Sequence, residues 1–414
     1  MNLAASLACG DAPDGGGTTS EVSVRDSAGI EIVENSIPED PALVFVTSDA
    51  PSLVIGGVEG DESQQLHRVQ DALRLPDGRI AVLNTGSHEV RIYGADGTFE
   101  SAFGRQGDGP EEFGFPSQLE LVPPDTLVVW DTRTWETSWF LADGSFVRKE
   151  PGRTAYESHV PEGRRGQGLY SVPGVGFILN TYDFAAEHSP GEVFVPSVEL
   201  TFISEDGDLR VLGDFGGREQ VALKPEPGRA TAADVLFGTA GITAFGGRPA
   251  RVWAGRNDRY ELRQFTGDGR LERVVRTDRR PRAVTSEDVD RLIAQMEESL
   301  TGAGMPREMV ESQVRAVQGT PAPEFMALFG SIVVTEGGGA WVMRLRGPPS
   351  DWDAGPPNRY DAFGPDGSWR GLAEVPFGFR LLEIGADYVL GLRRNDLGVE
   401  SIELYDLETA TPTD

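Results

Sequence analysis

The dipeptide Asp-Gly recurs along this chain between short apolar runs, and it constrains the fold more than any other feature of the sequence. In residues 72–103 an apolar run meets Asp77-Gly78, a second run follows, and Asp96-Gly97 precedes a last run. Asp-Gly supplies the positive φ that a tight hairpin requires. The segment therefore predicts an antiparallel meander of four strands.

Five further segments show the same pattern, so the chain contains six copies of one unit. An aspartate marks the third turn of every copy, and in the last copy no glycine follows it. These aspartates are Asp96, Asp143, Asp206, Asp268, Asp366 and Asp406.

A four-stranded meander has two open edges and cannot bury both of its faces alone. Radial packing of such units into a β-propeller solves both problems. The sequence thus predicts an all-β protein, a six-bladed β-propeller over residues 22–408. The blades are expected at about 72–103, 119–147, 169–212, 242–275, 332–372 and 380–407. The last copy has three clear strands, so we expect the segment 52–55 to supply its outer strand and close the ring.

The insertion at residues 276–325 does not follow the β pattern. Thr285 begins a helix start signal, and apolar residues then follow helical spacing. Gly302 and Gly304 end this helix, and Pro306 begins a second one. We therefore expect a helical hairpin around 285–318, which either packs as an ornament or covers a ligand pocket as a lid.

Composition excludes several classes of function. The net charge is −29, from 66 acidic and 37 basic residues, so the surface repels nucleic acid and anionic lipid. Cys9 is the only cysteine, which excludes an intramolecular disulfide and a cysteine-based metal site. No apolar run approaches ~18 residues, so no transmembrane helix is expected.

Cys9 follows a run of small residues and precedes a low-complexity stretch at 11–20. This arrangement resembles the end of a bacterial lipoprotein signal. We expect residues 1–21 to be a truncated signal-like segment and flexible tether, with Cys9 as the lipidated residue. The protein would then be exported to the cell envelope, as an anchored lipoprotein or in the periplasm, touching the membrane only through its lipid. The alternative is that Cys9 is an incidental thiol in a disordered tail.

The linker after the first copy reads Gly-Arg-Gln-Gly-Asp-Gly-Pro-Glu-Glu-Phe at residues 104–113, followed by Pro116. It resembles the inter-blade signature of NHL-type propellers, with Glu111 in place of the usual glycine. The chain as a whole resembles bacterial six-bladed propellers of the NHL and TolB-like superfamily, many of which are predicted lipoproteins. The resemblance implies the fold; family members range from binding scaffolds to lyases and lactonases, so it does not select a function.

The Asp-Gly turns lie on one face of such a ring, and the long loops lie on the other. Long loops in compact domains commonly carry function, so we expect a small molecule, a glycan or a protein to bind at the long-loop face. The loops in question are 104–118, 151–168, 181–197, 213–237, 276–326 and 345–358.

Polar residues at the ends of the second strands are the candidate site residues. Asn84, Asp131 and Asn180 are oxygen ligands of the kind that suits Ca²⁺, although such residues are also good turn starters. Apart from this possible Ca²⁺ ion, no cofactor is expected. The full set of candidate ligand-binding residues is Asn84, Asp131, Arg133, Trp135, Asn180, Tyr182 and Arg344.

The four histidines show no metal-binding spacing, and no catalytic triad can be assembled. We therefore expect a monomeric, non-catalytic binding or scaffold propeller of the bacterial cell envelope. The alternative is a metal-dependent lactonase or lyase-like hydrolase that acts at the channel mouth. A third alternative is a periplasmic sensor domain.

Overall fold

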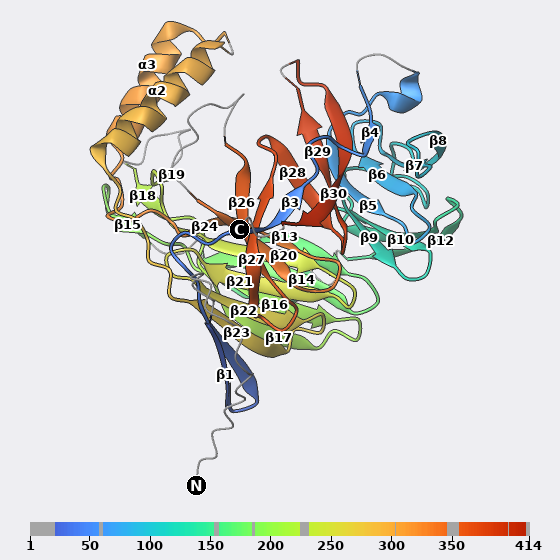
Figure 1. Ribbon diagram of the computed structural model, residues 1–414, viewed down its shortest axis with the longest axis horizontal. Coiled ribbons are helices and arrows are strands. Elements are labelled where there is room, and N and C mark those ends of the chain that lie inside the picture. Colours follow the sequence, from blue (N-terminus) through green and yellow to red (C-terminus); the bar gives the residue numbers. More distant parts are fainter. Residues whose placement is uncertain are drawn as a thin grey trace.

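The computed structural model describes residues 21–57, 61–152, 157–183, 187–223, 232–302, 304–345, 356–395 and 397–410 (Figure 1). Most of these residues lie in β-strands, and the strands form twisted sheets arranged about one centre. The predicted all-β class is therefore confirmed.

Three four-stranded antiparallel units come first along the chain. The first contains β5 (Val69–Arg74), β6 (Ile80–Asn84), β7 (Glu89–Tyr93) and β8 (Phe99–Phe103). The second contains β9 (Pro116–Val122), β10 (Thr126–Asp131), β11 (Glu136–Leu141) and β12 (Phe146–Pro151). The third contains β13 (Arg164–Val172), β14 (Gly176–Asp183), β16 (Val198–Ser204) and β17 (Leu209–Asp214).

Short elements occupy some of the segments between these units. A 3-10 helix, η1 (Glu62–Gln64), precedes the first unit. A separate three-stranded sheet consists of β15 (Val193–Phe194), β18 (Gln220–Ala222) and β19 (Ala232–Asp234). This small sheet falls in segments for which the sequence predicts loops.

N-terminal strands extend the next unit, a feature that the sequence did not predict. That unit contains β20 (Gly241–Gly246), β21 (Arg251–Arg256), β22 (Glu261–Thr266) and β23 (Leu271–Thr277). Here β2 (Ile30–Ser36) pairs in parallel with β23, and β1 (Glu21–Ser27) pairs antiparallel with β2. The buried Asn35 of β2 also donates to the carbonyl of Gly367 (3.1 Å) and accepts from the N–H of Trp369 (2.7 Å). The N-terminal hairpin is thereby fixed to two units at once.

The last two units are joined through β3 (Leu43–Thr47), which is parallel to β27 (Trp369–Val375) and antiparallel to β30 (Glu400–Thr409). One unit contains β24 (Phe329–Val334), β25 (Ala340–Arg344), β26 (Asn358–Phe363) and β27 (Trp369–Val375). The other contains β28 (Phe379–Ile384), β29 (Tyr388–Arg394) and β30 (Glu400–Thr409). Its fourth strand is β4 (Leu53–Ile55), which pairs antiparallel with residues 402–404 of β30.

The Asp-Gly turns have the geometry that their sequence requires. Gly97 and Gly144 take φ values of +81° and +88°, which glycine adopts without strain. The carboxylate of Asp96 accepts the N–H of Thr98 (3.0 Å), and the carboxylate of Asp143 accepts that of Ser145 (2.8 Å). The aspartate thus stabilises the turn, and the glycine permits it.

The role predicted for Asp406 is wrong, because this residue does not mark a turn. It lies within β30, which continues to Thr409 and pairs there with β3. No glycine follows Asp406 to permit a hairpin, and the outer strand of this unit comes from the N-terminal part of the chain instead.

The first strands of consecutive units form a closed ring. β5 packs beside β9, and β20, β24 and β28 follow one another back to β5. Between β9 and β13, Gln118 donates to the carbonyl of Ser171 (3.1 Å). Between β13 and β20, the rings of Tyr170 and Phe245 stack 4.7 Å apart. A ring of inner strands with sheets radiating outward is the architecture of a β-propeller.

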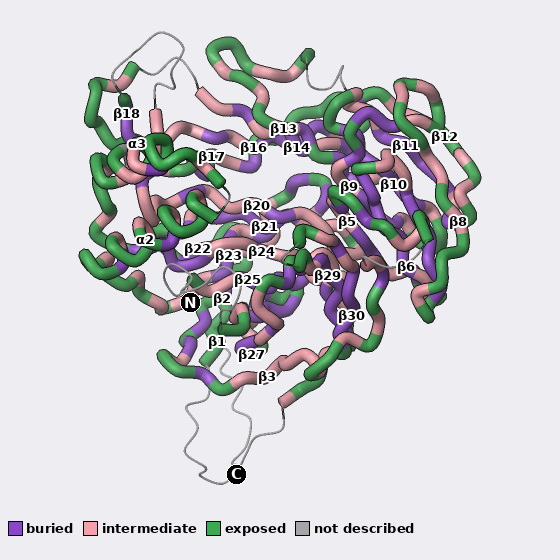
Figure 2. Tube along the Cα trace, turned by 90° about the horizontal axis from the view of Figure 1, so that it is seen from above, coloured by how far each residue is buried: buried purple, intermediate pink, exposed green. Residues whose placement is uncertain are grey.

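Hydrophobic clusters lie between neighbouring units and hold the ring together. Leu83 and Leu127 share a cluster between the first two units, and Trp253 and Phe329 share one between the units of β20 and β24. Figure 2 shows the buried segments along the inner and middle strands, whereas the outer strands β8 and β12 are largely exposed. Burial of large apolar side chains between units is the main stabilising contribution.

The predicted helical insertion contains α2 (Ser286–Gly302) and α3 (Arg307–Gln318), which pack on each other. Thr285 and Asp288 form the reciprocal capping bonds at the start of α2 (2.9 and 3.2 Å). The helical pair lies to one side of the ring (Figures 1 and 2). In the described part of the chain, no helix has the length and apolar character needed to cross a membrane.

Candidate functional site in the central channel

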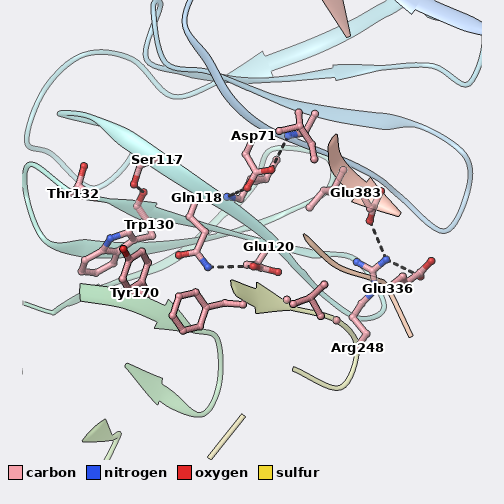
Figure 3. Close-up of a pocket in the computed structure, with 18 residues that line it drawn as sticks. Asp71, Ser117, Gln118, Glu120, Trp130, Thr132, Tyr170, Arg248, Glu336 and Glu383 are labelled. Atoms are coloured by element: carbon pink, nitrogen blue, oxygen red, sulfur yellow. Dashed lines mark hydrogen bonds and ion pairs between the residues drawn. The ribbon is translucent and has the colours of Figure 1, made fainter. Parts of the chain in front are cut away.

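A cavity of about 390 Å³ lies where the inner strands meet (Figure 3). Residues of β5, β9, β13, β20, β24 and β28 line it, together with the turns after β20 and β24 and with Trp130 and Thr132. On β9 the cavity begins at Ser117, near the long-loop end of the strand, whereas it meets β20 and β24 at their short-turn ends. It therefore crosses the channel obliquely and has a volume suited to a small molecule.

Three carboxylates from three inner strands dominate one side of this cavity (Figure 3). Asp71 of β5 accepts the N–H groups of Leu119 and Ala72 (both 2.9 Å). Glu120 of β9 accepts one bond, from Nε2 of Gln118 (3.1 Å). The third, Glu383 of β28, accepts the N–H of Arg74 (2.7 Å) and the hydroxyl of Tyr388 (2.9 Å). Asp71 and Glu383 thus also tie neighbouring inner strands together.

Arg248, from the turn after β20, brings a positive charge to this side. Its guanidinium donates to Glu336 (2.7 Å) and to Glu383 (3.3 Å). Asp71 and Glu120 have no ion-pair partner within 4 Å among the residues that the structure describes. Arg380 comes from the same strand as Glu383, but its guanidinium donates to the carbonyls of Val69 and Gln70 (2.9 and 3.1 Å).

The surroundings favour the protonated forms of these carboxyl groups. Burial of Asp71, reinforced by the charges of Glu120 and Glu383, raises its pKa to about 8, against the effect of its two N–H bonds. Burial likewise raises the pKa of Glu120 and that of Glu383. Removal from water disfavours the ionised form of an acid. Titratable groups with such shifts inside a cavity often mark a functional site.

Aromatic side chains form the opposite side of the cavity. Tyr170 and Phe245 stack there, and Trp130 lies beside them with only 2% of its surface exposed. The indole Nε1–H of Trp130 and the Oε1 of Gln118 are buried and have no hydrogen-bond partner within the described chain. A buried donor without an acceptor is costly, so the wall retains unused hydrogen-bonding capacity.

Asn84 and Asp131, two of the predicted site residues, are buried and hold loops in place. Asn84 accepts the N–H of His67 (2.8 Å) and donates to Ser87 (2.7 Å). Asp131 accepts backbone N–H groups of the preceding linker and the following turn: those of Gly114 (2.6 Å), Phe115 (2.9 Å), Arg133 (2.9 Å) and Thr134 (3.0 Å). Although Trp130 and Thr132 line the cavity, Asp131 between them does not.

The other candidates on the second and third units lie apart from the cavity lining. Asn180 and Tyr182 are half-buried on β14, and Oδ1 of Asn180 is buried without a hydrogen-bond partner in the described residues. Arg133 is exposed. Trp135 is half-buried, and its ring lies 6.5 Å from that of Trp130. Their roles in ligand binding stay predictions.

Arg344 is part of a buried charged network between two units. Its guanidinium pairs with Asp361 of β26, whose side chain is fully buried. Arg279 (3.0 Å), Tyr260 (3.0 Å) and Trp369 (3.0 Å) also donate to Asp361. The ion pair with Asp361 holds the Arg344 guanidinium between the two units, and Arg344 does not line the cavity.

The described residues do not form a complete set of metal ligands. Among the described residues, no group of three or more His, Cys, Asp or Glu side chains is placed to hold a metal ion. The trio Asn84, Asp131 and Asn180 comes from three strands of three different units, and its role as a calcium site stays a prediction. Cys9 lies outside the described residues.

The cavity carboxylates are the residues that sequence reasoning missed. Each interrupts an apolar inner strand: Asp71 in Val-Gln-Asp-Ala-Leu, Glu120 in Leu-Glu-Leu, and Glu383 in Leu-Leu-Glu-Ile. A charged side chain is rarely placed in such a strand unless it is paired or functional. The signal lies in the inner strands, whereas the predicted site residues lie at the ends of the second strands and in the loops.

Comparison with known proteins gives structural likeness only. No protein-family model matches the chain, and no curated protein matches it. A member of the DUF4221 family from Bacteroides vulgatus is similar in structure, with 10% identity and a TM-score of 0.47 over 89% of this chain and 99% of that one. Virginiamycin B lyase from Staphylococcus aureus follows with 9% identity and a TM-score of 0.36, over 83% of this chain and 96% of that one.

A gluconolactonase from Xanthomonas campestris is similar at 13% identity, with a TM-score of 0.36 over 89% of this chain and 99% of that one. At these identities and TM-scores, the likenesses carry no argument about what this chain binds or catalyses. The conclusion that stands on the structure itself is that the chain is a β-propeller with a polar cavity at the centre of its ring.

Proposed function

We propose that this protein is a non-catalytic binding propeller of the bacterial cell envelope, which holds a small molecule in the central cavity. One observation carries the proposal: inner strands from all around the ring converge on a single cavity that is polar on one side and aromatic on the other. A concave site of this size that combines apolar and aromatic side chains with convergent polar groups is typical of small-molecule binding.

The proposal includes a ring of six blades that resembles NHL and TolB-like propellers. Its support is the order of pairing, in which β4 completes the last unit as the outer neighbour of β30. Six hydrophobic clusters, each between two consecutive units, support the same count. The β1–β2 hairpin and β3 add to the outer edges of blades and do not form further ones.

A fragment screen tests binding in the cavity. Ser117 lines the cavity and is half-buried, so the indole of Ser117→Trp would occupy part of the cavity and obstruct it. We expect fragments that raise the melting temperature of the wild-type protein to lose this effect in Ser117→Trp. Ser145→Trp is the matched control, because Ser145 is exposed in a turn, and it should retain every hit. A screen without hits, or hits retained by Ser117→Trp, would contradict cavity binding.

Localisation to the envelope rests on the sequence around Cys9. A lipidated cysteine followed by a flexible stretch would tether the propeller to a membrane that its acidic surface does not itself bind. Metabolic labelling with palmitate tests this in a bacterial host that expresses the gene together with the sequence upstream of Met1: the wild-type protein should incorporate label and Cys9→Ser should not. An unlabelled wild-type protein in the soluble fraction would refute the tether.

The alternative of a metal-dependent hydrolase is less well supported by the geometry. The described residues offer no cluster of three metal-binding side chains, and both oxygens of Asp131 are occupied by N–H groups. Two of the carboxyl groups in the cavity, those of Asp71 and Glu383, already accept backbone N–H bonds that hold the inner strands together. We therefore favour binding over metal-dependent chemistry.

A further inference from the structure

The cavity wall carries more acidic than basic side chains, and this excess bears on the charge of the ligand that it can bind. Four carboxylates line the cavity, and Arg248 is the one basic residue in its lining, already engaged by Glu336 and Glu383. Neither Asp71 nor Glu120 forms an ion pair within 4 Å with any residue that the structure describes. Within the described part of the chain, the Glu120 carboxylate accepts only the bond from Gln118, so most of its lone pairs can accept a donor from the cavity.

The aromatic side supplies the complementary half of a binding site. Trp130 and Tyr170 lie on the side of the cavity away from Asp71 and Glu383 (Figure 3). Phe245, which stacks on Tyr170, also lines the cavity. Aromatic faces attract cations and also bury apolar groups. The buried, unpartnered Nε1–H of Trp130 and Oε1 of Gln118 show that this wall is not saturated by the protein's own hydrogen bonds.

We propose that the cavity binds an organic cation, an amine with a small apolar body, whose ammonium group faces Asp71 and Glu120 while its body packs on Tyr170, Phe245 and Trp130. This inference rests on the proposed function, because it names the ligand class of the same cavity. An anionic ligand would meet four carboxylates. A bare divalent ion would need a convergent set of ligands, which the described residues do not provide.

Protonation state and ligand charge are coupled in this cavity. The groups that face it are Asp71, Glu120, Glu383 and Glu336, with Arg248 from the turn after β20 and Tyr170 from β13. Burial favours the protonated carboxyl groups, whereas a bound cation favours the ionised forms. Binding of an ammonium group should therefore release protons, and a neutral analogue should not cause this release.

A matched series of probes tests the proposal: 2-phenylethylamine as the cation, 2-phenylethanol as the neutral analogue and 3-phenylpropanoate as the anion. Isothermal titration at pH 8 should give an affinity for the amine at least about tenfold above that for the alcohol, which corresponds to ~1.4 kcal/mol. No binding is expected for the anion. Repeating the titration in buffers of different ionisation enthalpy should reveal proton release with the amine only.

Variants assign the effect to the cavity. Glu120→Gln retains the size of the side chain and removes the charge, so it should lower the affinity for the amine about tenfold and leave that for the alcohol unchanged. Glu100→Gln is the matched control, since Glu100 is exposed on β8 outside the cavity, and it should change neither affinity.

Equal affinity for the three probes, preference for the anion, or no binding of the amine would overturn the inference. So would an effect of Glu100→Gln as large as that of Glu120→Gln, because the selectivity would then come from the overall negative charge. If the fragment screen yields cavity ligands that are neutral or anionic, the proposed binding function stands and this inference alone fails. If the screen yields no cavity ligand, both fail.

Discussion

At the scale of single residues, polar side chains at the ends of the second strands serve to position loops. Asn84 and Asp131 accept N–H groups from the segment before their own unit's inner strand. Asn257, two residues beyond Gly255, does the same with the N–H of Ala240 (2.7 Å). The sequence places polar residues at these strand ends, where they were expected to bind a ligand or to start a turn. The direction of these side chains could not be predicted, because it depends on how the segment 17 residues earlier passes the end of the strand once the unit has folded.

Asp131→Ala should therefore destabilise the fold. The change leaves four buried or half-buried N–H groups without their acceptor, and each such loss costs about 0.5–1.5 kcal/mol. We expect the free energy of unfolding in urea to fall by about 3 kcal/mol. Asp290→Ala, an exposed position on α2, should change it by less than about 0.5 kcal/mol.

The opposite pattern would revive the calcium hypothesis. If Asp131→Ala unfolded like the wild-type protein but released a stoichiometric metal ion, Asp131 would be a ligand and not a loop anchor. Metal analysis of both purified proteins, alongside the urea curves, separates the two roles.

At the scale of elements, local signals were sufficient for hairpins and helices but not for long-range pairing. Asp-Gly turns and the capped start of α2 follow from a few adjacent residues. In contrast, β2 pairs with β23, whose residues lie about 240 positions later, and no local pattern specifies that partner. The pairing of β4 with β30 followed from the missing fourth strand of the last unit, which is a constraint on the whole ring.

Ile55→Ala tests how much the short strand β4 contributes. Ile55 is fully buried in the cluster that joins the last and first units, and truncation of such a side chain typically costs about 2–5 kcal/mol. Val54, the preceding residue, is 51% exposed, so Val54→Ala should cost less than about 0.5 kcal/mol. Equal effects in urea unfolding would mean that β4 does not close the ring in solution.

At the scale of the whole molecule, the candidate site lies where all the inner strands meet. The sequence pointed to the long-loop face, since loop length is visible in a linear sequence. The cavity arises from Asp71, Glu120 and Glu383, which are 49 and 263 residues apart along the chain and approach one another only when the ring closes. Their shared environment, and hence their raised pKa values, could not be predicted before the ring was known.

The pH dependence of stability follows from that environment. The pKa of Asp71 is about 8 in the folded protein against 3.8 for the free side chain. Between these values the folded state holds a proton on Asp71 that the unfolded state has released, so the contribution of Asp71 to stability falls as pH rises from about 4 to about 8. The raised pKa values of Glu120 and Glu383 act in the same direction.

Asp71→Asn removes one of these titrating groups and should flatten the profile. Because Asp71 is half-buried and not fully enclosed, we expect the loss of stability between pH 5 and pH 8 to shrink by about 2 kcal/mol, less than the full linkage value. At pH 5 the variant should be less stable by about 1 kcal/mol, since an amide nitrogen cannot accept an N–H bond. Asp77 has a lowered pKa in an exposed turn, so Asp77→Asn should leave the slope unchanged in this window. Parallel urea-unfolding profiles for the wild-type protein and Asp71→Asn would show that Asp71 is ionised throughout, and the cavity would then hold a permanent negative charge at neutral pH.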